Sequence, residues 1–289
     1  MSVAPAACVA LPRETILRLA RFLPADLGVL AQLGEMLQDA NSDLDAIAAL
    51  LRRDVALAAR IVRISNGPVF GGVGRIASVE EAVNRVGFGE ILKLVGTASA
   101  ARFSQRSLEN YGISARKLRD NMLYGALAGE ALARASGADS RCAYTAGLLR
   151  PLGMMVLNQA ARELGGRAPH YIPTQWSGYS AWEESVFGID HCAVCALVLD
   201  EWRFPLEIGE AIRDHRMTRR EDFADPLAAL LNVANGLAHR VSRSFAGESQ
   251  WWDLTDEKLR AAGLTANDFE PAIVWTESAF ESAVAAMVV

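Results

Sequence analysis

Residues 145–157 read Thr-Ala-Gly-Leu-Leu-Arg-Pro-Leu-Gly-Met-Met-Val-Leu. The apolar residues 146–149 are typical of a helix end, and a second apolar helix is expected to start after the polar break at Arg150 and Pro151. Proline fixes its own φ and disfavours the helical conformation of the residue before it, so we expect a rigid junction with Arg150 extended. The stretch therefore predicts two consecutive helices separated by a break that carries one cation.

Helix start and stop signals recur on both sides of this junction. Asn41, Ser42 and Asp43 offer a choice of N-cap for one helix, and the next is expected to start at about Asp54. N-cap side chains also stand before apolar runs at Ser78, Ser180 and Asp225. The pairs Ser78–Glu81 and Ser180–Glu183 have the spacing of a capping box, and Gly137 is expected to be a left-handed cap. Helices are therefore expected at about 24–37, 44–51, 54–64, 79–86, 91–103, 117–136, 180–187, 191–202, 206–215 and 226–241, and from about 265. Strand-type alternation is hard to find, so the predicted fold class is all-α.

The bulk properties exclude several classes of protein. The chain has 289 residues, of which 51% are hydrophobic, so a large core is expected and disorder is not. A formal net charge of −5 makes a general nucleic-acid partner unlikely. Four cysteines are too few for a disulfide scaffold, and no run approaches 18 apolar residues. The amino terminus makes a poor signal peptide. We therefore expect a cytoplasmic protein without a membrane span.

Several blocks of sequence, taken in order, resemble one protein family. They are 57–66, 70–71, 75–76, 78–82, 86–87, 146–149, 187–191, 201–205 and 211–215. This set is similar to the HDOD domain family, non-catalytic relatives of the HD-type metal-dependent phosphohydrolases. The resemblance departs from the family pattern at Gly67 and Pro68, where a Ser-Ala pair is usual.

The resemblance implies both an architecture and a role. It predicts an HD-like multi-helix core with an amino-terminal helical layer, over residues 21–216. Residues 1–20 are expected to be a leader, loose over 1–12, and residues 217–289 a helical extension that completes the core. HDOD domains are regarded as bacterial regulatory modules, often joined to response-regulator receiver domains or cyclic-dinucleotide domains.

The positions that match the HD metal ligands hold unsuitable side chains. The family's enzymes need an early His, a His-Asp pair and a late Asp. Asn121, Arg150, Pro151 and Asn235 stand there, while His191 and His215 remain. Arginine cannot lose its proton to bind a metal, and proline offers no side-chain donor atom. We therefore expect vestigial metal-site positions, with no catalytic residue, bound metal or other cofactor.

Three placements of Arg150 are open on the sequence. The guanidinium turns into the old metal cavity as a surrogate for the cation, stands at its mouth as an anion-binding residue, or points into solvent. Arg213, Arg216 and Arg220 are spaced to share a helix face, which is a candidate anion- or partner-binding stripe or a solvated face.

Two weaker motifs have simpler explanations. Cys192 and Cys195 form a CxxC motif beside His191. A structural zinc site normally has four ligands, and a CxxC redox site normally lies in a βαβ unit. We therefore expect the two cysteines to be small buried residues of a core helix. The glycine-rich residues 71–74 lack the strand and the Lys-Ser/Thr pair of a phosphate-binding loop. Trp251, Trp252 and Trp275 are expected to pack between carboxy-terminal helices.

The function predicted from the sequence is a non-enzymatic signal-transduction module that binds an unidentified signalling protein. Self-association into a homo-oligomer is a further option. The alternatives are a residual metal-dependent phosphohydrolase and a non-hydrolytic binder of a cyclic dinucleotide or another anionic nucleotide. No membrane partner is expected.

Overall fold

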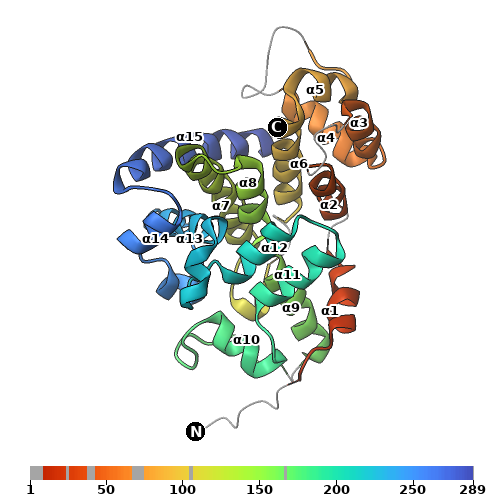
Figure 1. Cartoon of the computed structure of the whole chain (residues 1–289). Helices are drawn as coiled ribbons and strands as arrows, with labels where there is room; N and C mark the ends of the chain where they lie inside the picture. Colours follow the sequence, from red (N-terminus) through yellow and green to blue (C-terminus); the bar gives the residue numbers. More distant parts are fainter. Residues whose placement is uncertain are drawn as a thin grey trace.

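The computed structural model describes residues 9–23, 26–37, 43–66, 75–103, 107–165 and 168–288. These residues form α-helices and short 3-10 turns, and their only strand-type pairing is the isolated bridge between Leu108 and Ile113 (Figure 1). The all-α prediction is confirmed. Within the described residues, no helix is both long enough and apolar enough to cross a membrane.

The amino-terminal layer contains five helices packed on one another. They are α2 (Asp26–Leu37), α3 (Leu44–Leu51), α4 (Val55–Ser65), α5 (Val79–Val86) and α6 (Phe88–Phe103). The expected caps are present: the side chains of Asp43, Asp54 and Ser78 accept from the backbone N–H of residues 45, 57 and 81. The reciprocal bond of Glu81 goes to the N–H of Ala77, so the capping box is only half formed. Pro24 and the glycines of residues 71–74 lie outside the described residues.

The central bundle is built around α7 (Ala115–Ser136), which packs against α8 (Ser140–Leu149) and reaches α6 in the amino-terminal layer. Ser114 caps its start, and Gly137, with φ of 79°, ends it as predicted. Helix α9 (Leu152–Leu164) follows α8 directly, so the two helices expected around residues 145–157 are confirmed. Helix α9 packs against α1 and α11.

The next helices surround that bundle. They are α10 (Tyr179–Phe187), α11 (His191–Glu201) and α12 (Leu206–Asp214). Helix α1 (Arg13–Ala20) packs on α9 and α11 through Ile16, Leu19 and Ala20. The N–H groups of Val9 and Leu11 donate to carbonyls at the end of α10. Residues 9–12 are thus held in place, and the expectation of a loose leader is wrong for them.

The carboxy-terminal part lies against the same bundle. It contains α13 (Pro226–Arg240), α14 (Asp256–Ala261) and α15 (Phe269–Val288). Asp225 caps α13 and Pro226 occupies its first turn, as predicted. Helix α13 packs on α7, α8 and α12, while α15 crosses α7 and reaches α6 (Figure 1). Most of α13 is buried, and each fully buried aliphatic side chain stabilises by roughly 1.5–3 kcal/mol.

Glycines allow two pairs of core helices, α7 with α8 and α9 with α11, to approach closely. A Cβ on Gly147 of α8 would lie 2.4 Å from the carbonyl oxygen of Gly125 in α7. A Cβ on Gly153 of α9 would lie 1.9 Å from the carbonyl oxygen of His191 at the start of α11. Both distances are far below van der Waals contact, so only glycine fits at these crossings. The crossings bring α7, α9 and α11 around the α8–α9 junction.

The junction itself differs from the prediction in one respect. Arg150 has φ of −45° and ψ of −46°, which is helical and not extended. Its N–H donates to the carbonyl of Ala146 at 3.0 Å, so the helical path of α8 continues through Arg150 up to Pro151. The preference imposed by the following proline is weak enough for this backbone bond and the contacts of the buried side chain to override it.

Candidate functional site

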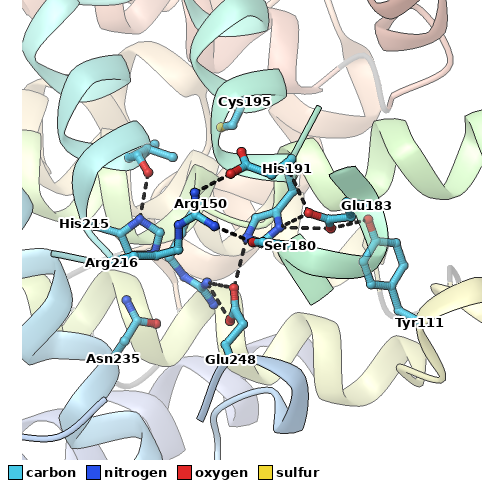
Figure 2. A network of polar contacts seen from close by, with 12 residues as sticks. Tyr111, Arg150, Ser180, Glu183, His191, Cys195, His215, Arg216, Asn235 and Glu248 are labelled. Carbon is cyan, nitrogen blue, oxygen red and sulfur yellow. Dashed lines mark hydrogen bonds and ion pairs between the residues drawn. The ribbon is translucent and has the colours of Figure 1, made fainter. Parts of the chain in front are cut away.

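Arg150 points into the interior and is 1% exposed. One terminal nitrogen, Nη1, lies 2.8 Å from each carboxylate oxygen of Glu248 (Figure 2). The other, Nη2, donates to the side-chain oxygen of Asn121 at 2.6 Å. Glu248 belongs to the 3-10 turn Ala246–Trp251, which follows α13. Of the three placements open on the sequence, the side chain occupies the inward one.

The Arg150–Glu248 pair is fully buried. Burial opposes ionisation of Glu248, but the charge of Arg150 and the contact with His191 outweigh it and lower the pKa of Glu248 to about 2. The guanidinium also lies 5.5 Å from the ring centroid of Phe245 and 5.7 Å from that of Trp252. Rings at this distance attract a cation through their faces. Arg150 is thus a permanent internal cation with an internal counter-ion.

His191, the first residue of α11, lies between two buried carboxylates. Its Nδ1 donates to Glu183, 2.7 Å from Oε2, and its backbone N–H donates to the same carboxylate at 2.9 Å. Its Nε2 lies 3.0 Å from Glu248 as an ion pair, without the alignment of a hydrogen bond. Burial lowers the pKa of His191, but the neighbouring Cys192 and Glu183 raise it well above its ordinary value. His191 is therefore an imidazolium that links Glu183 to Glu248.

Glu183 also contacts Tyr111, which lies in the segment between α6 and α7. The hydroxyl of Tyr111 donates to Glu183 at 2.6 Å, and burial together with this carboxylate raises the pKa of Tyr111. The predicted Ser180–Glu183 capping box is wrong. Helix α10 begins at Tyr179, with Gly178 as its N-cap residue. The carboxylate of Glu183 accepts a hydrogen bond from the backbone N–H of His191 instead of capping the helix. The hydroxyl of Ser180 accepts from Arg216.

These contacts form one continuous interior network, which we term the buried polar chain. Its members, in order of contact, are Tyr111, Glu183, His191, Glu248, Arg150 and Asn121. Asn121 ends the chain by donating to the backbone carbonyl of Arg243 at 2.9 Å. Members from six segments of the sequence converge here, and Figure 2 shows Arg150 and His191 meeting at Glu248. The network ties the central bundle to the carboxy-terminal part.

His215 lies beside the buried polar chain but in a different protonation state. Its Nδ1 donates to the carbonyl of Ile212 at 2.7 Å, and its ring stacks on Trp252 with 5.6 Å between centroids. Burial and the charge of Arg150 lower the pKa of His215 to about 3. His215 is therefore neutral, in contrast to His191.

The remaining vestigial positions make local contacts. Asn235 of α13 donates to the carbonyl of Leu231, one turn earlier in its own helix, at 2.8 Å. Pro151 stands at the start of α9. The structure thus joins Asn121, Arg150, His191 and Glu248 in one network and places His215 beside them, whereas the amide of Asn235 bonds within its own helix.

The predicted arginine stripe is not a single helix face. Helix α12 ends at Asp214, before Arg216 and Arg220. Arg213 pairs with Asp214, and Arg216 turns inward to Ser180 and Asp190, with its guanidinium 5.1 Å from the ring of Trp251. Of these three arginines, Arg220 alone is exposed without an ion pair among the described residues.

The cysteines and tryptophans lie in packed surroundings. Cys192 and Cys195 are fully buried and free, and the thiol of Cys195 donates to the carbonyl of Leu149 at 3.4 Å. Trp275 packs under the guanidinium of Arg134, with 4.8 Å to the ring centroid.

The side chains around Arg150 do not fit a divalent metal. Asn121 directs its oxygen at the guanidinium, His191 has no free lone pair when protonated, and Arg150 would repel a cation at close range. Among the described residues, no cluster of three or more His, Cys, Asp or Glu side chains has the arrangement of a metal site. What the arrangement does chemically is neutralise two buried carboxylates with two buried cations.

Sequence reasoning missed three members of the buried polar chain. Glu248 lies outside every site that the sequence predicts, Glu183 has the spacing of a helix cap, and Tyr111 lies between the helices expected at 91–103 and 117–136. The sequence offers one general indication of such a partner: an arginine that is buried needs an acidic side chain to balance its charge. That rule does not say which of the chain's 34 acidic residues it is.

Comparison with known proteins places the chain in context. Residues 23–218 match the HDOD domain family. An uncharacterized protein of Treponema pallidum (strain Nichols) is 26% identical over 221 residues, which cover 71% of this chain and 40% of that protein. The chain therefore spans well under half the length of this relative.

Solved structures share the fold at low sequence identity. An HDOD domain protein with unknown function from Geobacter sulfurreducens superposes with a TM-score of 0.68 at 20% identity, over 95% of this chain and 98% of that one. A candidate signal transduction protein from Marinobacter aquaeolei VT8 gives 0.69 at 21% identity, over 92% and 59%. A candidate phosphohydrolase from Shewanella amazonensis SB2B gives 0.62 at 18% identity, over 94% and 96%.

Proposed function

Because the chain belongs to the HDOD domain family, we propose that it is a non-enzymatic regulatory module of bacterial signal transduction that acts by binding a protein partner. Structurally similar proteins are described as signal transduction or phosphohydrolase candidates, so the fold alone is compatible with both roles. The side chains inside this particular chain favour the first.

The observation that carries the proposal is the contact of Arg150 with both oxygens of Glu248. By its resemblance to the HD enzymes, Arg150 stands at a sequence position of their metal-binding pair, and its Nη1 lies 2.8 Å from both oxygens of a buried carboxylate. In this arrangement Arg150 is a surrogate for the metal cation, since it brings a permanent charge and donors in a fixed fork. It supplies no Lewis-acidic centre and no activated water.

The two retained histidines support the same conclusion. His191 lies between the carboxylates of Glu183 and Glu248. The Nδ1 of His215 donates to a backbone carbonyl, and one face of its ring stacks on Trp252. Neither histidine is exposed to solvent. The interior therefore has a structural role, and recognition is left to the surface.

Metal analysis combined with activity assays tests this proposal. Purified protein, as isolated and after incubation with Mn²⁺ or Fe²⁺, is assayed with a cyclic dinucleotide and a chromogenic phosphodiester, beside an active HD-type phosphodiesterase as positive control. We expect metal content far below one ion per chain and no turnover above the buffer. Metal-dependent turnover that disappears in both His191→Gln and His215→Gln would overturn the proposal.

A calorimetric titration with a panel of cyclic and linear nucleotides separates the two non-enzymatic options. No heat of binding is expected if the ligand is a protein. Saturable binding without turnover would replace the protein partner with an anionic nucleotide, and Arg220→Glu would then be the first variant to examine, because this exposed arginine has no ion pair among the described residues.

A further inference from the structure

An apolar groove lies between α11 and α12. These two helices pack against each other (Figure 1). The volume of the groove is about 380 Å³. Ala193 and Ala196 of α11 and Gly209 of α12 contribute small residues to its lining, and Leu197 and Phe204 contribute larger apolar side chains. A Cβ on Gly209 would meet only Ala196, at 3.8 Å, which leaves ordinary van der Waals room between the two helices. The groove can therefore accept an aliphatic side chain from outside.

Leu206 lines the edge of this groove and is itself exposed to solvent. It is the first residue of α12 and is 68% exposed, the largest exposure among the large hydrophobic residues that the structure describes. Fully burying such a side chain would stabilise an interface by roughly 1.5–3 kcal/mol. One patch of surface thus holds both a projecting aliphatic side chain and a hollow lined by apolar residues.

Charges of both signs border the same patch. Asp200 and Glu210 are acidic, and Arg213 is basic. Asp200 is within 3.3 Å of Arg13, and Arg213 is bonded to Asp214, so much of the charge is already balanced. A strongly acidic rim would favour a basic peptide, but a mixed rim can meet its own copy without net repulsion, even in a chain of net charge −5.

We propose that the α11–α12 face binds a second copy of this chain across a two-fold axis, with Leu206 of each copy seated in the groove of the other. In a two-fold interface the same patch is used on both subunits, so it must be complementary to itself. A patch with a projection, a hollow and both signs of charge meets that requirement. Specific interfaces bury roughly 800 Å² per partner, so the groove would be the centre of the contact and the exposed faces of α11 and α12 its rim. This inference is independent of whether the chain is an enzyme.

The oligomeric state in solution, measured by sedimentation equilibrium over a concentration series, tests the proposal. The wild-type chain is expected to approach twice its mass of 31.2 kDa as concentration rises. Leu206→Glu is expected to weaken association at least tenfold because it places a charge in the apolar groove. An acidic side chain suits the first turn of a helix, so α12 should form normally, and a thermal melt checks this. Leu206→Met, which keeps the volume and apolar character, should still associate.

Val274→Glu provides the matched control. Val274 is 62% exposed on α15, away from the groove lining, so the same change there should leave association unchanged. A wild-type chain that stays monomeric throughout the series would overturn the proposal. So would a Leu206→Glu variant that associates like the wild type, or a Val274→Glu variant that dissociates as readily as Leu206→Glu.

Discussion

At the scale of single residues, the defining feature is a buried ion pair with a histidine between two carboxylates. Arg150 and Glu248 lose their hydration when buried, and their attraction offsets that cost only because Asn121, His191 and two aromatic rings complete the surroundings. Replacing one partner alone is therefore expected to lower the stability of the fold more than replacing both partners with apolar residues would.

Replacement of Arg150 by alanine tests this directly. The variant leaves the carboxylate of Glu248 buried without its main counter-ion, and we expect the free energy of unfolding to fall by about 3–5 kcal/mol, with a melting temperature lower by several degrees. In a double-mutant cycle with Glu248→Gln, the double variant should be less destabilised than the sum of the two single changes. The measurement is denaturant unfolding followed by circular dichroism.

Arg141→Ala is the control for that cycle, because Arg141 pairs with Asp139 at the surface, where ion pairs contribute at most about 1 kcal/mol. Equal losses of stability in Arg150→Ala and Arg141→Ala would show that the buried pair has no special role.

The two buried histidines predict opposite pH dependences. The pKa of His215 is lowered from 6.5 to about 3, so between these values the unfolded chain binds a proton that the folded chain does not, and stability falls as pH decreases below 6.5. The pKa of His191 is raised, so above pH 6.5 the folded chain keeps a proton that the unfolded chain loses, and stability falls as pH rises. Glu248, lowered from 4.5 to about 2, adds to the acid-side loss only below about pH 4.5.

Unfolding free energies measured over a pH series distinguish these contributions. His215→Gln should flatten the slope on the acid side of pH 6.5 by at most one proton, about 1.4 kcal/mol per pH unit, and leave the alkaline side unchanged. His191→Gln should flatten the alkaline side instead. The assignment fails if either variant alters the slope on the other side.

At the scale of elements, the buried polar chain depends on how closely the helices approach. Arg150 stands at the end of α8, Asn121 on α7 and His191 at the start of α11, and glycines at the helix crossings set their separations. Gly153 is the tightest of these contacts, since the carbonyl of His191 fills the space a side chain would need.

Gly153→Ala is therefore expected to be destabilising although alanine is the better helix former. The added Cβ would lie 1.9 Å from the carbonyl oxygen of His191, so α9 and α11 must separate, and we expect a loss of at least about 1–3 kcal/mol. Thermal unfolding measures it. Gly89→Ala, at a helical position with nothing within 4 Å of the added carbon, should be neutral or slightly stabilising. A neutral Gly153→Ala would mean that the helices do not pack this closely.

At the scale of the whole molecule, the carboxy-terminal part and the central bundle share one interior. Helix α13 packs on α7, α8 and α12, and the turn after it supplies Glu248. Residues beyond 218, where the family match ends, therefore provide the counter-ion for a residue at the centre of the matched region.

A chain truncated after Met217 tests whether this dependence governs folding. It would expose the apolar faces that α13 covers and leave Arg150 without Glu248, so we expect it to be insoluble or to lack fixed tertiary packing. Near-ultraviolet circular dichroism and the cooperativity of thermal unfolding report the outcome. A truncated chain that unfolds as cooperatively as the full one would show that residues 218–289 are not needed for the core.

Local patterns in the sequence were sufficient for most of the helices, but not for α1, which lies in the expected leader, or for α14. Apolar periodicity, Asp and Ser caps and Gly137 act over a few residues, so α3, α4, α7, α8 and α13 follow from the printed order of amino acids. The same local rules failed at Arg150 and at Ser180–Glu183, where backbone preference and capping chemistry compete with contacts made by distant residues.

The sequence by itself determined that this chain is all-α, and its resemblance to the HDOD family predicted Asn121, Arg150, Pro151 and Asn235 as vestigial positions of an HD metal site. Only the tertiary structure decided that Arg150 faces inward and that Glu248, 98 residues away, is its partner. The physical reason is that periodicity and capping depend on neighbours in the chain, whereas the pairing of a buried charge depends on which side chains the packed helices bring within about 3 Å.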